Sequence, residues 1–387
     1  MPLPRTLELT VDRLANGGDG VGRAPDGRVT FIPFAAPGDR LRVRITEARR
    51  RYLRASLIEI IEPGPSRVKP ICPVFGRCGG CSWQHLGYRG QLEAKERILR
   101  DALTRIGKLA AVPEQIEMRG SPKAYGYRNR ARVSVERGAV GFRRRRSHEI
   151  CATARCPVLV SALDDTLGEL ASSSQAARGD WELAAGDSGE VSLLAPDGRT
   201  LGEERIRIRV AGDTVAISAG VFSQANIALR ADLADAVHQA AGEGELALEL
   251  FSGAGFLTLG LARRFKRVVA IESHAGAVRD LRGNLRGAGI DSVEVHAAPV
   301  EDALSGASLG SLRPDVVVLD PPRTGLPRGV ASAITAEKVV YLSCDPATLA
   351  RDLASLEQCG FGLTRVTGFD LFPQTPHVEA LVVAERS

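Results

Sequence analysis

The spacing of the hydrophobic residues changes along the chain. Residues 1–62 alternate apolar and polar side chains in short runs at 7–11, 29–32, 40–45 and 53–61, and turns rich in glycine and proline separate these runs. Several short strands so close together predict a small β-barrel. From 91 to 106 the apolar residues recur at helical spacing with charges between them, which predicts a helix with one buried face.

The rest of the chain shows two further patterns. Residues 134–215 alternate short strands with turns that contain Gly, Ser and Asp. After Val221, apolar runs alternate with helical stretches, and the expected strands lie at 246–250, 267–271, 292–295, 315–319, 338–342 and 378–384. This alternation predicts a Rossmann-like α/β fold with a mostly parallel sheet. We expect a barrel over 1–62, a small β-rich domain over 63–215 and an α/β domain over 216–387, against which helix 91–106 packs.

Length and composition narrow the class of protein. A chain of 387 residues exceeds what one hydrophobic core usually organises. Its contents of 44% hydrophobic and 25% charged residues are ordinary for a soluble globular protein. No apolar run approaches the roughly 18 residues of a membrane span, and residues 1–5 lack the apolar core of a signal peptide. We therefore expect a cytoplasmic protein without a membrane partner.

Basic residues gather in two clusters, at 49–51 with Arg54 and at 143–146, although the formal net charge is only +5. Such clusters suit phosphate backbones. The segment 125–133 interleaves tyrosine with arginine, a mixture that can hold RNA by charge and stacking. An ordinary solvated, arginine-rich surface is the alternative interpretation of these features.

Cys72, Cys78 and Cys81 lie close together and indicate a metal or cluster site. The Gly-Gly pair between the last two lets the backbone fold around a centre. Seven cysteines in a cytoplasmic chain favour metal binding or catalysis over a disulfide framework. A fourth ligand is needed, and the spacing chooses neither between Cys151 and Cys156 nor between zinc and an iron–sulfur cluster.

A glycine-rich turn follows the first strand of the α/β region. The order is strand 246–250, a turn with Phe251, Gly253 and Gly255, a helix, strand 267–271 and then Glu272. This is the arrangement of nucleotide-binding doubly wound sheets, in which an acid about 20 residues further on binds a ribose. Thr258 replaces the third glycine of the dinucleotide pattern. The sequence Glu-Leu-Phe-Ser-Gly-Ala-Gly is instead similar to that of S-adenosylmethionine enzymes.

Polar residues follow several expected strands at their carboxyl ends, where ligands bind in open α/β sheets. Asp320 and Cys344 lie at such ends, as do Glu272 and the glycine turn. Pro346 suits the first turn of a helix, so the thiol of Cys344 is expected near a helix N-terminus, which favours thiolate. A buried, inert cysteine is the alternative. The charge of neighbouring Asp345 opposes ionisation of the thiol and has no explanation in the sequence.

Three motifs carry a resemblance to a known family: Asp320-Pro-Pro-Arg-Thr-Gly, Ser343-Cys-Asp-Pro-Ala-Thr-Leu-Ala-Arg-Asp and Phe372-Pro-Gln-Thr-Pro-His-Val-Glu. They resemble the motifs that define the RNA 5-methyluridine (uracil-C5) methyltransferases. Phe222-Ser-Gln-Ala-Asn resembles that family's segment before the donor-binding strand. Residues 1–62 resemble a TRAM domain, an OB-like RNA-binding barrel. Together with the cysteines, these features are similar to the family's iron–sulfur branch, which acts on ribosomal RNA.

The resemblance implies a class I methyltransferase domain with an antiparallel last hairpin, and an iron–sulfur central domain. It implies S-adenosylmethionine as methyl donor, a 4Fe–4S cluster, and 23S ribosomal RNA as the partner of a monomeric enzyme. Cys344 would add to carbon 6 of uracil, Glu379 would be the base, and Asp320 would complete the catalytic site. The implied donor-binding residues are Gln224, Phe251, Gly253, Gly255, Glu272 and Asp320, and the implied cluster ligands are Cys72, Cys78, Cys81 and Cys156.

Two alternatives remain at this point. The same thiolate chemistry also serves transfer RNA, or a cytosine in place of uracil. Phe256 and Pro299 stand where the family usually has asparagine near the donor. These two residues motivate the other alternative, an iron–sulfur RNA-binding protein without catalytic activity.

Overall fold

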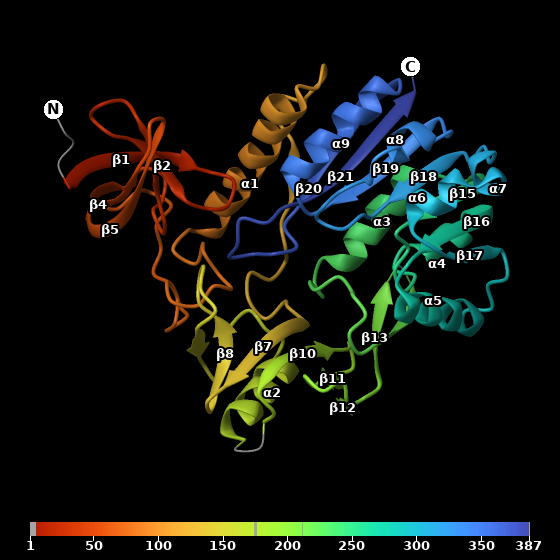
Figure 1. The fold of residues 1–387 in the computed structure, drawn as a ribbon, viewed down its shortest axis with the longest axis horizontal. Helices are drawn as coiled ribbons and strands as arrows, with labels where there is room; N and C mark the ends of the chain where they lie inside the picture. The colour runs from red at the N-terminus through yellow and green to blue at the C-terminus, as the bar shows by residue number, and fades with distance from the viewer. Residues whose placement is uncertain (1–4, 174–175, 211, 387) are drawn as a thin grey trace.

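The computed structural model describes residues 5–173, 176–210 and 212–386. Residues 1–4, part of the segment that was compared with a signal peptide, lie outside the described residues. Figure 1 shows an N-terminal barrel at one end of the molecule, a smaller central sheet, and a large C-terminal sheet with helices. Helix α1 (Tyr88–Ala102) lies between the barrel and the C-terminal sheet (Figure 1). Within the described ranges, no helix is long and apolar enough to cross a membrane.

The N-terminal strands form a closed barrel in the order β1-β2-β3-β5-β4. Residues along β1 are alternately exposed and buried, so that one side of the strand faces the interior. Val11, Ile32 and Leu53 belong to the aliphatic core of the barrel. The barrel expected from the sequence is therefore confirmed. Its strands are β1 (Thr6–Leu14), β2 (Gly20–Arg23), β3 (Val29–Ile32), β4 (Arg40–Ala48) and β5 (Tyr52–Glu62).

The central part contains an antiparallel six-stranded sheet in the order β12-β11-β10-β7-β8-β9. Helix α2 (Ser161–Ser172) packs on this sheet through Leu163, Leu167 and Leu170. Short strands were expected here from the sequence, but helix α2, whose leucines recur at helical spacing, was not. The strands are β7 (Arg130–Glu136), β8 (Ala139–Arg143), β9 (Ile150–Ala152), β10 (Gly179–Ala185), β11 (Val191–Leu194) and β12 (Thr200–Gly202).

The C-terminal sheet has eight strands in the order β17-β16-β15-β18-β19-β21-β20-β6. The strands from β17 to β19 are parallel, and β21 is antiparallel to both of its neighbours, as expected for the last strand. The bounds are β15 (Gly244–Leu250), β16 (Phe265–Glu272), β17 (Val293–Ala297), β18 (Val316–Leu319), β19 (Lys338–Ser343), β20 (Phe361–Phe369) and β21 (Glu379–Arg386).

Helices pack on both faces of this sheet, because its central strands are apolar on both sides. Val317 and Val318, neighbours in β18, belong to two different hydrophobic clusters. The helices are α3 (Arg230–Ala241), α4 (Thr258–Ala262), α5 (Ala275–Gly287), α6 (Val300–Ser305), α7 (Ala307–Gly310), α8 (Val330–Ala333) and α9 (Pro346–Gln358).

Two segments from the N-terminal half of the chain complete the C-terminal domain. Strand β6 (Glu117–Arg119) pairs in parallel with β20 at the edge of the sheet. Leu99 and Leu103, from α1 and the π-helical turn η1 (Leu103–Gly107), lie in the same hydrophobic cluster as Leu349 of α9. Helix α1 therefore packs on the C-terminal domain.

The hairpin of β13 (Arg205–Val210) and β14 (Asp213–Ser218) also joins this domain. Its Ile206 and Val215 lie in one hydrophobic cluster with Leu233 of α3. The boundary that we expected after residue 215 falls inside β14, since the hairpin packs as one unit.

Candidate active site and cysteine centre

Cys344 lies directly after β19, between the end of the sheet and the start of α9. Asp345 is the N-cap of α9, and its Oδ1 accepts a hydrogen bond of 2.8 Å from the backbone N–H of Thr348. Pro346 follows in the first turn, where its missing N–H is no loss. Asp345 therefore has a structural role, because its carboxylate satisfies the helix N-terminus.

Glu379 lies opposite Cys344 across two neighbouring strands. β19 and β21 are antiparallel, and Ser343 pairs with Ala380. The next position of this antiparallel ladder sets Cys344, one residue after Ser343, against Glu379, one residue before Ala380. Glu379 is only 2% exposed, and its charge raises the pKa of the Cys344 thiol.

Burial shifts the titration of all three catalytic candidates. It raises the pKa of Cys344 to about 11, and the charges of Glu379 and Asp320 act in the same direction. Burial also raises the pKa of Asp320 to about 7 and that of Glu379 well above its usual range. Strongly shifted acids that meet in one place are typical of catalytic sites.

Arg323 is a further candidate residue of this site, one that the sequence did not single out. Its guanidinium opposes the shifts just described, because its charge lowers the pKa of both Cys344 and Glu379 and it hydrogen-bonds the thiol. It belongs to the Asp320-Pro-Pro-Arg motif, so its position was visible in the sequence. What the sequence did not show is that the turn after β18 directs this side chain toward Cys344.

The turn between β15 and α4 has an unusual backbone. Gly253 and Gly255 have φ of +56° and +98°, and Phe251 also lies in the left-handed region at +65°. Such strain in a residue that is not glycine is found preferentially at functional sites. A side chain at Gly253 would meet open space, so the backbone of the turn is accessible to a ligand.

Glu272, at the end of β16, is held against this turn. Its carboxylate accepts hydrogen bonds of 2.9 Å from the N–H of Gly253 and 2.6 Å from that of His274. Behind the turn, burial raises the pKa of Glu249 to about 8. The structure thus brings together the glycine turn and the acid that the sequence pairs for binding a nucleoside.

Gln224 lies in the segment before α3 and is 5% exposed. Its neighbour Asn226 donates a hydrogen bond of 3.2 Å from Nδ2 to the carbonyl of Leu371, which ties this segment to the loop before Glu379. Phe256 packs against a hydrophobic cluster, and Pro299 is the N-cap of α6. Phe256 and Pro299 therefore each have a structural role where they lie, in core packing and at a helix start.

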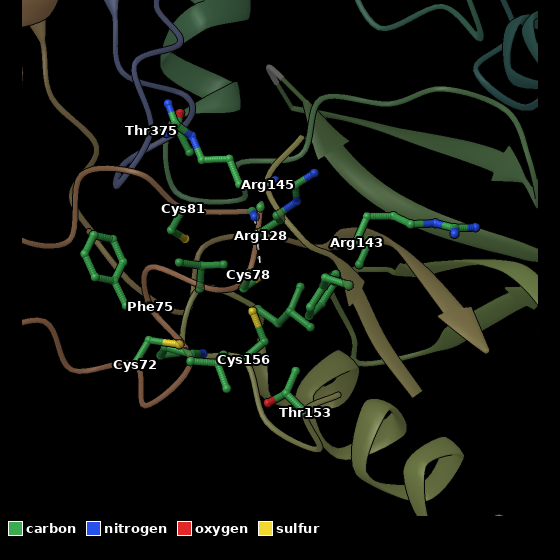
Figure 2. A pocket seen from close by; sticks show the side chains of 18 of the residues that line it. Cys72, Phe75, Cys78, Cys81, Arg128, Arg143, Arg145, Thr153, Cys156 and Thr375 are labelled. Atoms are coloured by element: carbon green, nitrogen blue, oxygen red, sulfur yellow. Dashed lines mark hydrogen bonds between the residues drawn. The ribbon is translucent and has the colours of Figure 1, made fainter. Parts of the chain in front are cut away.

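Four cysteines line one cavity of about 420 Å³ next to the central sheet: Cys72, Cys78, Cys81 and Cys156. Figure 2 shows their side chains around a common space, with Thr375 of the C-terminal domain also lining it. Cys151 is buried in β9 and does not belong to this lining. Among the residues described, no group of three or more His, Cys, Asp or Glu side chains is arranged so that it could hold a metal ion.

Matches to known families agree with this architecture. Residues 207–387 match the tRNA (Uracil-5-)-methyltransferase family, and residues 4–58 match the TRAM domain. An RNA methyltransferase of Synechocystis sp. is 33% identical, over 97% of this chain and 95% of the relative. The chain belongs to the RNA (uracil-C5)-methyltransferase family. A 23S rRNA (uracil(1939)-C(5))-methyltransferase, RlmD of Aeromonas salmonicida, is 31% identical over 99% of this chain and 97% of the relative.

A solved structure of this RNA (uracil-C5)-methyltransferase family shares the fold. The tRNA (uracil-54, C5)-methyltransferase of Pyrococcus abyssi, in complex with S-adenosyl-L-homocysteine, matches with a TM-score of 0.77 and 25% identity, covering 98% of this chain and all of that chain. The expected class I methyltransferase fold and the use of S-adenosylmethionine are thereby confirmed. The protein is an enzyme that methylates carbon 5 of a uridine in RNA.

Proposed function

We propose that the uridine lies in 23S ribosomal RNA and that Cys344 and Glu379 carry out the reaction through a covalent RNA adduct. The register that sets Cys344 opposite Glu379 is the observation that carries the mechanism. The relative RlmD, named for 23S rRNA, is 31% identical over nearly the whole chain, against 25% for the transfer-RNA enzyme of known structure. This difference favours ribosomal RNA over transfer RNA as the substrate.

The covalent route answers a chemical difficulty, which is that carbon 5 of uracil is a poor nucleophile. The thiolate of Cys344 adds to carbon 6, and the resulting enolate attacks through carbon 5. The donor supplies an electrophilic methyl group and leaves as S-adenosylhomocysteine. Glu379 then removes the proton from carbon 5, the bond between carbon 6 and sulfur breaks, and the thiolate is regenerated.

The charges in the site favour a sequence in which Cys344 reacts first and Glu379 acts as a base afterwards. A charged Glu379 disfavours the thiolate of Cys344, and the effect is mutual because a Coulomb interaction acts on both partners. Formation of the carbon–sulfur bond moves this charge to the enolate, and methyl transfer from the sulfonium then neutralises it, after which Glu379 ionises more easily. Since burial raises the pKa of Glu379, its carboxylate is a stronger base than one in water, which suits removal of a carbon-bound proton.

For the donor, we assign the glycine turn and Glu272 to the nucleoside. Glu272 is only half-buried, and its position beside Gly253 places a carboxylate where the two hydroxyls of a ribose would bind. Phe251, Gly255, Gln224 and Asp320 complete the proposed donor pocket. The carboxyl group of Asp320 lies near both Cys344 and Glu379, so this residue borders the donor pocket and the uridine site.

We further propose a 4Fe–4S cluster held by Cys72, Cys78, Cys81 and Cys156. Two of the four sulfur atoms have backbone N–H partners of the kind that thiolate ligands usually have: Gly80 donates to Cys78 Sγ at 3.3 Å, and the backbone at Val158 donates to Cys156. A single zinc ion binds sulfur at about 2.3 Å, so that its four thiolates converge on one point. The four cysteines instead surround a cavity, which suits a larger group.

Iron content tests the cluster, and Cys151 provides the matched control for Cys156. We expect anaerobically purified protein to be brown, and Cys156→Ser to lose most of its iron because a fourth ligand is removed. Cys151→Ser should keep its iron, since this thiol lies outside the cavity lining. Iron and zinc are measured by elemental analysis. A colourless, active protein containing zinc would contradict the cluster.

The substrate is tested with RNA that lacks the modification. We expect the purified enzyme and labelled S-adenosylmethionine to methylate 23S ribosomal RNA from a strain in which this gene is deleted, at a single uridine. Transfer RNA from the same strain should remain unlabelled. Mapping of 5-methyluridine by mass spectrometry identifies the site, and labelling of transfer RNA alone would reverse the assignment.

A further inference from the structure

The loop between β20 and β21, residues 370–378, leads directly to Glu379 and is held mainly by residues from the first half of the chain. We call it the base loop. Its central residue, Gln374, is 3% exposed and has a left-handed φ of +70°. A residue other than glycine keeps such a conformation only where its surroundings enforce it.

Gln91 of α1 supplies part of that enforcement through a reciprocal pair of hydrogen bonds. The backbone N–H of Gln374 donates to Gln91 Oε1 at 2.8 Å, and Gln91 Nε2 donates to Gln374 Oε1 at 3.0 Å. Gln91 is itself fully buried. An amide that is buried away from water depends on these partners, so loss of the pair leaves polar groups of Gln374 unsatisfied.

The segment after Cys81 supplies a second attachment. The backbone N–H groups of Ser82 and Trp83 both donate to the carbonyl of Gln374, each at 3.0 Å. Cys81 is the residue immediately before Ser82, and Thr375, immediately after Gln374, lines the cysteine cavity. The base loop therefore contacts the cysteine centre in two ways: Gln374 is hydrogen-bonded to the two residues after Cys81, and Thr375 lines the cavity.

Lys95 and Tyr127 make three further contacts with the part of the base loop that precedes Gln374. Lys95 of α1 and Asp370 form an ion pair in which both side chains are fully buried, and Lys95 Nζ also donates to the carbonyl of Phe372 at 3.0 Å. The hydroxyl of Tyr127 donates to the carbonyl of Pro373 at 2.9 Å. Because a buried ion pair holds only in good geometry, Asp370 has little freedom to move.

We propose that Gln374 is a positioning residue and that, through its contacts with Gln91 and residues 82–83, the cysteine centre sets the location of Glu379. The inference rests on the proposed role of Glu379 as the base. Residues 82 and 83, which directly follow Cys81, hold the carbonyl of Gln374, and Glu379 follows five residues later. Loss of the centre or of the Gln91 pair lets the base loop move, and removal of the carbon-5 proton slows more than methyl transfer does.

Gln91→Ala tests the attachment. We expect a covalent, methylated protein–RNA adduct to accumulate during turnover, at several times the wild-type fraction, because the base is misplaced while the nucleophile is intact. Hydrogen exchange of the amides in 371–378 should become at least about tenfold faster, while α9 stays protected. A contact that only stabilises the fold would lower both chemical steps together and produce no adduct.

Two variants act as controls for this test. Arg89→Ala changes an exposed residue of the same helix and should leave both adduct and exchange at the wild-type level. Gln374→Gly removes the side-chain amide while glycine tolerates the positive φ, so it should reproduce the adduct without added backbone strain. It also serves if Gln91→Ala does not fold.

Coupling to the cysteine centre is tested with Cys156→Ser, a change far in sequence from Ser82. Faster exchange in 371–378, as in Gln91→Ala, is expected. Unchanged protection there would overturn the coupling, and absence of adduct in both glutamine variants would overturn the positioning role. If Glu379→Gln itself formed no adduct, the proposed role of the base would be at fault instead.

Discussion

Cys344→Ala is expected to reduce methylation by roughly 10⁴-fold or more, since loss of a covalent nucleophile removes the route itself. Without the thiolate, carbon 5 of the uridine is not activated, however well the RNA and donor are bound. Methyl transfer from labelled S-adenosylmethionine measures the activity. RNA affinity, measured by gel shift, should remain near that of the wild type.

Cys359→Ala is the matched control for this experiment. Cys359 is the C-cap of α9, the helix that starts just after Cys344, and it lies at the opposite end from the site. Its replacement should leave turnover unchanged. Substantial turnover by Cys344→Ala would contradict a covalent mechanism.

Glu379→Gln is expected to trap the methylated RNA on the protein. Glutamine keeps the size of the side chain but does not accept a proton, so the thiolate adds and the methyl group transfers while elimination fails. Turnover should fall by about 10²- to 10⁴-fold, the usual contribution of a general base. The adduct is detected as a protein–RNA band on a denaturing gel that carries label from the donor.

Glu385→Gln provides the comparison on the same strand, because Glu385 is partly exposed near the far end of β21. It should show normal turnover and no trapped RNA. If Glu379→Gln lost activity and gave no adduct, Glu379 would have to act before or during attack by the thiol, as a group that assists addition.

Local pattern predicted much of the catalytic domain. Strand β18, the turn at Gly253 and the helix that starts at Pro346 were all predicted, because apolar runs, glycine and proline act over a few residues. The same information placed Glu272 and Cys344 at the ends of strands. The role of Asp345 was missed, although Asp directly before a Pro in the first turn of a helix is a sequence signal for an N-cap, and the structure shows it accepting from Thr348.

Contacts between distant parts of the chain were not predictable from the pattern. Strand β6 is only three residues long, too short to give a periodic signal, and its partner β20 lies far along the sequence. Gln91 and Gln374 are ordinary polar residues in the sequence, and only the fold shows that each satisfies the other. The direction of Arg323 likewise depends on packing around its turn.

The pairing of β6 with β20 can form only late in synthesis of the chain. Thr367 pairs with Glu117, a separation of 250 positions, so at 5–20 residues per second the ribosome needs about 12 to 50 s to supply the partner. During that interval Leu99 of α1 and Leu103 of η1 lack the C-terminal residues that cover them in the folded protein. The nascent chain can therefore close its barrel early, whereas its catalytic pocket assembles only when the last strands emerge.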